Sequence, residues 1–156
     1  AVVEAEAVRF RLARLRYDDG NTRDQLGLDA TQRLLTRPHL MVDGLASLYT
    51  SRGSRGDTVG YFNPERDASA NLGLAFDHIT WRRYETAFQQ RLQVMAGPYW
   101  QRERGTQWVP SLGYRHLWRR DGHELEYGVA WSRPVYDGLR EQRLAFDVEL
   151  RWGGAR

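Results

Sequence analysis

Residues 143–152 alternate between large apolar side chains and mostly charged ones. A period of two along the chain is typical of a β-strand that has one apolar and one polar face. The apolar parity holds Leu144, Phe146, Val148, Leu150 and Trp152, and the other parity holds Ala145, Asp147, Glu149 and Arg151. We therefore predict a strand of ten residues. Its apolar face contacts either a protein core or lipid.

The same alternation recurs in seven further segments of about ten residues. Two of them, 7–17 and 25–34, alternate less regularly than the others. The clear apolar rows fall at 40–48, 70–76, 92–96, 108–114, 125–131 and 144–152. We expect an all-β, antiparallel up-and-down meander of about eight strands, with these rows on one convex face. Segment 30–36 is also compatible with a helical turn.

The connections between the predicted strands alternate in length. If the last strand ends in the periplasm, the outer connections are 18–21, 51–68, 101–107 and 133–142, and the inner ones are 36–39, 81–87 and 119–123. The outer connections are mostly longer, and only 18–21 is short. Short periplasmic turns and longer outer loops are the pattern of outer-membrane β-barrels. We treat residues 1–156 as a single barrel domain or a fragment of a barrel.

Composition excludes several classes of protein. The sequence has no cysteine, so it offers neither disulfides nor Cys-metal sites. All 23 basic residues are arginines, and they alternate with 20 acids to give a net charge of +3. Nucleic-acid binders concentrate positive charge in a patch, so we expect no nucleic-acid partner. No apolar run approaches the roughly 20 residues of a membrane helix. That excludes a helical span and leaves a β-barrel open.

Aromatic and small residues favour a membrane barrel over a soluble sandwich. All six tryptophans lie at or near the ends of predicted strands, where aromatic side chains anchor a barrel at the two membrane interfaces. Glycine and alanine are frequent on the polar faces, which suits a barrel interior. A soluble barrel or sandwich, whose apolar face meets a second sheet, remains the alternative.

Five short strings occur in order along the chain. They are GYFNPERD (60–67), WRRYE (81–85), GPYWQ (97–101), YRHLW (114–118) and SRPVYDG (132–138). Together they resemble the C-terminal barrel of the poly-β-1,6-N-acetyl-D-glucosamine export porins, over residues 48–152. The resemblance implies a bacterial outer-membrane protein that exports a partly de-N-acetylated biofilm polysaccharide. In that family a periplasmic tetratricopeptide-repeat domain precedes a sixteen-stranded barrel.

This chain departs from the family pattern in two respects. It has no helical-repeat region, and it has about eight predicted strands. An eight-stranded barrel is filled by its own side chains, whereas about sixteen strands leave an aqueous channel. We therefore expect the C-terminal half of a sixteen-stranded barrel. The implied partners are the polysaccharide, outer-membrane lipid, and periplasmic export and deacetylase proteins.

Acidic residues on the polar faces are candidates for a path that amine-bearing sugars follow. The candidates are Asp43, Asp77, Glu124, Glu126, Asp147 and Glu149. The last four lie on two neighbouring strands, where we expect little inward positive charge opposite them. Weak, repeated sites suit conduction, because a tight site would trap the polymer. The other interpretation is that arginines pair with these acids across strands and merely fill the barrel.

Two inward tyrosines, Tyr49 and Tyr99, are candidates for stacking on sugar rings, or else they pack within the lumen. We expect no metal, cofactor or catalytic site. The four histidines are scattered, none has metal-ligand spacing, and His116 is expected on the outward face. A small β-barrel that binds a ligand, an outer-membrane enzyme, and adhesion through loop 51–68 remain alternatives.

Overall fold

The computed structural model describes residues 6–55 and 60–152, and every regular element in them is a β-strand. In this part of the chain no helix is long and apolar enough to cross a membrane. The strands are β1 (Glu6–Arg16), β2 (Thr22–Arg37), β3 (Leu40–Gly53), β4 (Arg66–Arg83), β5 (Thr86–Gln101), β6 (Gly105–Arg120), β7 (His123–Ser132), β8 (Val135–Tyr136), β9 (Leu139–Arg140) and β10 (Arg143–Trp152).

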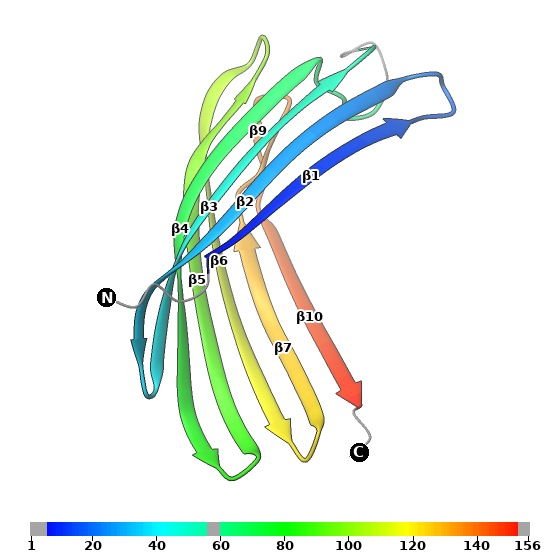
Figure 1. The fold of residues 1–156 in the computed structure, drawn as a ribbon. Helices are drawn as coiled ribbons and strands as arrows, with labels where there is room; N and C mark the ends of the chain where they lie inside the picture. Colours follow the sequence, from blue (N-terminus) through cyan, green and yellow to red (C-terminus); the bar gives the residue numbers. More distant parts are fainter. Residues whose placement is uncertain (1–5, 56–59, 153–156) are drawn as a thin grey trace.

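Eight of these strands form one curled sheet in the order β1-β2-β3-β4-β5-β6-β7-β10, and every neighbouring pair is antiparallel. The predicted up-and-down meander is therefore confirmed. The sheet curls into half of a barrel wall, and its edges β1 and β10 remain apart (Figure 1). Strands β8 and β9 form a separate small hairpin within the last outer connection.

The apolar rows lie on the convex face of the curl, as the alternation predicted. Leu72 on β4 is 72% exposed, and Leu144 and Phe146 on β10 are 74% and 72% exposed. Among the described residues, Ala75 and Val135 are the only buried hydrophobic ones. A sandwich would bury the apolar face against a second sheet. Here no second sheet covers it, and the uncovered band is the surface that a barrel turns to lipid.

Tryptophans border this band at both ends. On the inner side, Trp81, Phe88 and Trp118 are direct cross-strand neighbours on β4, β5 and β6. On the outer side, Trp100 lies near the end of β5, and Trp108 lies near the start of β6, where it is 61% exposed. Two aromatic borders around an apolar band match the interface girdles of membrane barrels.

A bulge explains why the pattern of 30–36 looked ambiguous. This segment belongs to β2, so the helical alternative is wrong. The register between β2 and β3 shifts between Arg33 and Leu35, and the extra residue, Leu34, has no partner. A bulge lets two consecutive residues leave the alternation. Leu34 and Leu35 are accordingly both exposed, at 58% and 36%.

Most strands are longer than ten residues, so most connections are shorter than predicted; the first outer connection is one residue longer and the last has the predicted bounds. Each inner turn (38–39, 84–85 and 121–122) has two residues. At 121–122 both residues have positive φ, and an Asp-Gly pair suits that hairpin turn. The outer connections are 17–21, 54–65, 102–104 and 133–142. The predicted loop 101–107 is thus a three-residue turn, and residues 56–59 of the predicted loop 51–68 lie outside the described residues.

Candidate lumenal site

The eight candidate residues share the concave face of the curled sheet. Direct cross-strand partners in a sheet point to the same side, and so do residues two apart on one strand. Asp43 lies opposite Ala75, which is fully buried, and Asp77 follows two residues later. Tyr49 and Tyr99 both lie opposite Ser69, from the two strands that flank β4. The concave side is therefore the side on which a conduit would run.

Four acids gather near the inner end of β7 and β10, and we call Glu124, Glu126, Asp147 and Glu149 the four-acid cluster. Glu149 lies directly opposite Glu126, and Asp147 lies opposite Gly128. The four side chains therefore project to one side, as the strand pattern predicted. The side chains of Asp147 and Glu149 are 45% and 54% exposed, whereas those of Glu124 and Glu126 are about a quarter exposed.

The expectation of little positive charge near this cluster is wrong. Arg115 pairs with Glu126 at 3.0 Å and reaches Asp147 at 3.5 Å. Arg119 donates to Glu124 at 2.6 Å. Arg151 lies 2.8 Å from Glu149 and 3.5 Å from Glu124.

Arg119 escaped notice because residue 119 was placed in a predicted turn, whereas β6 continues to Arg120. Four carboxylates against three guanidinium groups leave a formal charge of −1 on this part of the wall. Each acid thus has an arginine partner, as the barrel-filling interpretation expects, and the cluster as a whole keeps an excess of negative charge.

The two other candidate acids lie deeper in the wall, and each faces an arginine directly across a strand pair. Arg33 on β2 donates to Asp43 on β3, whose side chain is 7% exposed. Arg91 on β5 lies 3.1 Å from Asp77 on β4, and Gln89 also donates to Asp77 at 3.2 Å. Buried carboxylates need such partners because an unpaired buried charge is costly. The main role of Asp43 and Asp77 is therefore to connect neighbouring strands through these ion pairs.

At the outer end a buried group of side chains spans four strands, and we call Arg23, Ser51, Asp67 and Tyr99 the outer polar cluster. Arg23 donates to Ser51 at 3.0 Å and lies 3.2 Å from Asp67. Ser51 also donates to Asp67, and the Tyr99 hydroxyl donates to Asp67 at 3.0 Å. The hydroxyl of Tyr99 is thus held by protein, while the residue as a whole is partly exposed. Sequence reasoning missed Arg23, Ser51 and Asp67, which lie close to strand ends.

The last outer connection folds onto the concave face beside this cluster. Gln101 donates to Asp137 at 3.0 Å, and Gln107 donates to the carbonyl of Gly138 at 2.7 Å. Gln101 and Gln107 share the inward parity of Tyr99, because Gln107 lies opposite it. The β8–β9 hairpin, which carries Asp137 and Gly138 at its tip, is therefore fixed to the inner wall.

Residues 60–65 of the third-strand to fourth-strand connection fold inward as well. Phe62 lies under the guanidinium of Arg23, 5.9 Å from the ring centroid to the guanidinium carbon. Its ring also meets Tyr136 of the hairpin edge-on, with centroids 5.0 Å apart. Asn63 is buried against Gly53, where a Cβ would lie 2.9 Å from the Asn63 side-chain oxygen. The two outer loops thus meet over the outer end of the concave face and narrow it.

Metal and histidine chemistry find little support in the geometry. Within residues 6–55 and 60–152, no three His, Asp or Glu side chains gather in a way that could hold a metal ion. His116 lies on the convex face, as expected, stacked between Phe88 and Tyr127 at centroid distances of 5.1 Å each. It therefore cannot act together with the lumenal acids.

The curled antiparallel wall, its exposed apolar band with aromatic borders and its charged concave face define an outer-membrane β-barrel. Residues 3–153 match the family model described as PgaA membrane beta barrel domain, and the chain belongs to this family. It is 33% identical over 140 residues to the poly-beta-1,6-N-acetyl-D-glucosamine export protein of Escherichia coli K12, and equally to that of Escherichia coli O157:H7. The alignment covers 87% of this chain and 17% of each relative.

A solved structure, described as a bacterial polysaccharide outer membrane secretin, has the same fold. The two superpose with a TM-score of 0.90 at 28% identity, over 94% of this chain and 51% of that chain. The chain thus spans about a sixth of the length of its curated relatives and about half of the solved structure. It corresponds to part of a larger barrel wall.

Proposed function

We propose that this chain forms part of the wall of an outer-membrane exporter for poly-β-1,6-N-acetyl-D-glucosamine. The observation that carries the proposal is the polar, charged concave face of a sheet that superposes on half of a polysaccharide secretin. The E. coli export proteins supply the polymer class. A closed pore with this wall gives a polysaccharide an aqueous route through lipid.

Two unpaired edges make closure by further strands necessary. Within residues 6–55 and 60–152, β1 and β10 each have one strand neighbour, so a row of backbone groups on each has no partner strand there. Lipid does not tolerate such edges, because their N–H and C=O groups find no water there. Eight strands closed on themselves would leave an interior filled by side chains, while about sixteen leave a channel. We infer that a similar number of strands completes the barrel.

The four-acid cluster suits a polymer that carries some free amines. Removal of an acetyl group leaves a glucosamine with an ammonium group at neutral pH. The cluster has an excess of one carboxylate over its three arginines, and its members are partly exposed to the lumen. An ammonium group can therefore exchange places with an arginine at modest cost, because exposed ion pairs are individually weak. Such weak contacts let the polymer move on.

Tyr49 and Tyr99 add apolar surfaces to the path at the outer side. They lie in one cross-strand row, separated by Ser69, and face the concave side. Sugar rings have apolar faces that stack on aromatic rings. We propose that these tyrosines guide sugar rings toward the outer loops. Transport of this kind needs no catalytic step in the barrel, and any deacetylation belongs to periplasmic partner proteins.

Neutralising the four-acid cluster tests the proposal. The variant carries Glu124→Gln, Glu126→Gln, Asp147→Asn and Glu149→Gln in the full-length protein. We expect export of the glucosamine polymer to fall severalfold, measured by immunoblot of the culture medium. The amount of folded barrel in the outer membrane, followed by its heat-modifiable migration on gels, should stay unchanged.

A matched control neutralises four exposed acids in connections: Asp18, Glu85, Glu103 and Asp121. This control changes the net charge equally and leaves the concave face intact, so export should remain normal. Unchanged export in the four-acid variant would contradict the role of the cluster. Normal export from cells that lack the barrel would contradict the function itself.

A further inference from the structure

A row of arginines crosses the convex face at its outer end, beyond the apolar band. Arg14, Arg52, Arg66 and Arg102 form this row, which we call the outer arginine row. Arg14 lies opposite Asp24, Asp24 opposite Arg52, and Arg52 opposite Arg66, while the amide of Arg102 donates to the carbonyl of Arg66 at 3.0 Å. All four arginines are exposed. They share the outward parity of the apolar residues below them, such as Leu12 and Trp100.

Among the described residues, direct ion pairs with acids form at the two ends of the row. Arg14 donates to Asp24 at 2.5 and 2.9 Å, and Arg102 donates to Glu65. Arg52 and Arg66 lie directly opposite each other. Arg52 also faces Asp24 and interacts with it electrostatically, but neither arginine forms a direct ion pair with an acid among the described residues. Like charges directly opposite on neighbouring strands repel. An anion from outside the protein would therefore stabilise this pair of arginines.

The height of the row indicates where that anion comes from. Trp100, Ala68, Thr50 and Leu12 belong to one cross-strand row at the outer border of the apolar band. Arg102, Arg66, Arg52 and Arg14 each lie two residues beyond the member of that row on their own strand. At about 3.3 Å per residue and a tilt of about 40°, the row stands roughly 5 Å outside the aromatic border. Aromatic side chains mark the headgroup level. The row thus lies among the phosphates of the outer leaflet, where phosphorylated glycolipid is abundant.

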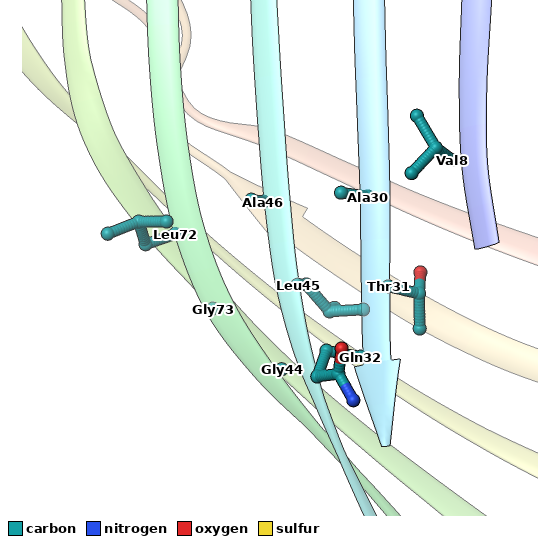
Figure 2. Close-up of a pocket in the computed structure, with 9 residues that line it drawn as sticks. All are labelled: Val8, Ala30, Thr31, Gln32, Gly44, Leu45, Ala46, Leu72 and Gly73. Atoms are coloured by element: carbon teal, nitrogen blue, oxygen red, sulfur yellow. The ribbon is translucent and has the colours of Figure 1, made fainter. Parts of the chain in front are cut away.

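A hollow on the convex face of the same strands provides a second, independent observation. Val8, Ala30, Ala46 and Leu72 form one outward cross-strand row on β1 to β4. The two alanines leave a hollow of about 470 Å³, which Gly44 extends. Figure 2 shows the side chains of Val8 and Leu72 standing on either side of Ala30 and Ala46.

The spacing between the hollow and the arginines matches a lipid. Ala46 lies six residues below Arg52 on β3, which at the same rise and tilt corresponds to roughly 15 Å of depth. That is about half of the 30 Å hydrocarbon core, the depth of one leaflet. A molecule with its phosphate on Arg52 can therefore reach the hollow with one acyl chain.

We propose that the convex face of β1 to β4 binds one phosphorylated glycolipid of the outer leaflet. Its phosphate lies between Arg52 and Arg66, and one acyl chain fills the hollow over Ala30 and Ala46. Guanidinium groups bind phosphate oxygens in a bidentate manner, so two facing arginines form a strong phosphate site. A bound lipid also removes the repulsion between the two arginines. The site is separate from the lumen and does not depend on the exported polymer.

Native mass spectrometry of the full-length barrel in detergent tests the proposal, with bis-phosphorylated lipid A as the probe. The variant Arg52→Gln/Arg66→Gln should bind it about thirtyfold more weakly, from roughly fivefold per arginine at a charged membrane surface. Dephosphorylated lipid A should bind wild-type protein as weakly as lipid A binds the variant. The matched control is Arg83→Gln/Arg120→Gln, which removes two exposed outward arginines near the inner turns and should leave binding unchanged.

A second variant tests the hollow without changing charge. Ala46→Phe fills the hollow and should weaken lipid A binding severalfold while leaving the folded barrel intact on heat-modifiability gels. Equal binding of phosphorylated and dephosphorylated lipid would overturn the phosphate site. If the Arg83→Gln/Arg120→Gln control lost as much lipid A binding as the Arg52→Gln/Arg66→Gln variant, the attraction would be non-specific. That result would overturn the phosphate site as well. Unchanged binding in Ala46→Phe would overturn the placement of the acyl chain.

Discussion

The guanidinium of Arg23 on β2 reaches across β3 to the carboxylate of Asp67 on β4, 3.2 Å away. Both residues are buried, at 6% and 3% relative exposure, and Ser51 on the intervening strand hydrogen-bonds to each. An ion pair that skips a strand holds three strands at one place. It also supports Phe62, whose ring lies beside Arg23. The position of an outer loop therefore depends on a pair buried in the wall.

We expect Asp67→Ala to destabilise the barrel markedly. It leaves Arg23 buried without its carboxylate, and breaking a buried pair on one side typically costs about 3–5 kcal/mol. The measurement is urea unfolding of the full-length protein in detergent, followed by tryptophan fluorescence. Asp24→Ala breaks the exposed pair with Arg14 and should leave the unfolding midpoint nearly unchanged. Equal shifts in the two variants would contradict a special role for the buried pair.

Gly97 on β5 should not tolerate even a methyl group. A Cβ there would lie 1.8 Å from the carbonyl oxygen of Ala70 on β4, and backbone cannot move aside cheaply. Gly97→Ala should therefore lower the free energy of unfolding by about 1–3 kcal/mol, the usual cost of overpacking. At Gly113 the nearest atom is 3.9 Å away, so Gly113→Ala serves as the tolerated control. The same urea titration separates them, and two equal midpoints would refute the argument.

Removing the contact between the outer loops should open the pore. Tyr136→Ala deletes the edge-on partner of Phe62 and frees the β8–β9 hairpin from loop 54–65. In planar lipid bilayers we expect the full-length barrel to show higher single-channel conductance and more frequent openings. Tyr84→Ala, at an inner turn where the tyrosine is 87% exposed, is the control and should conduct as wild type. Identical conductance of all three proteins would mean that these loops do not restrict the pore.

The first outer connection should loosen in acid. Asp19 accepts hydrogen bonds from the amide of Asn21 at 2.9 Å and from the hydroxyl of Tyr61 at 3.0 Å. The bond from the Asn21 amide holds the pKa of Asp19 below its ordinary value of 3.8. The lowered pKa means that this contact stabilises the loop fully above pH 3.8, and that the stabilisation is lost as the pH falls through the folded-state pKa.

Hydrogen exchange measures that loss. The protection of the Asn21 amide, corrected for the intrinsic rate, should decrease as the pH drops below 3.8. In Asp19→Asn the protection should be lower at neutral pH and should show no such decrease. A wild-type protection factor that stays constant from pH 6 to pH 2.5 would exclude this role of Asp19.

The alternation of side chains was sufficient to predict the strands and the face on which each side chain lies. A shift of the register by one residue would turn every apolar side chain to the polar face, so one register is favoured once one face is apolar. Leu72, Phe146 and their neighbours lie where the pattern put them. The strand ends were less predictable, since arginines such as Arg82 and Arg119 extend strands without extending the apolar row. This is why the arginine that pairs with Glu124 was expected in a turn.

The outer end of the site was beyond sequence reasoning. Arg23 and Asp67 are 44 residues apart, and no local pattern links them. Loops that fold back onto the wall depend on individual contacts, such as the one between Gln107 and the Gly138 carbonyl. The sequence did indicate that this part of the inner surface is polar, because Gln101 and Gln107 are polar residues at inward positions. Knowing what they bind required the three-dimensional arrangement.

Several ion pairs of the wall join direct cross-strand partners. They are Arg33 with Asp43, Asp77 with Arg91, and Glu124 with both Arg119 and Arg151. Such ties run across the strands, so at a strand tilt of about 40° they run mainly around the circumference. They oppose the separation of neighbouring strands and so resist any increase in the diameter of the barrel. The wall would therefore keep a nearly constant diameter while the proposed polymer passes, and the outer loops would be the part that moves to let it through.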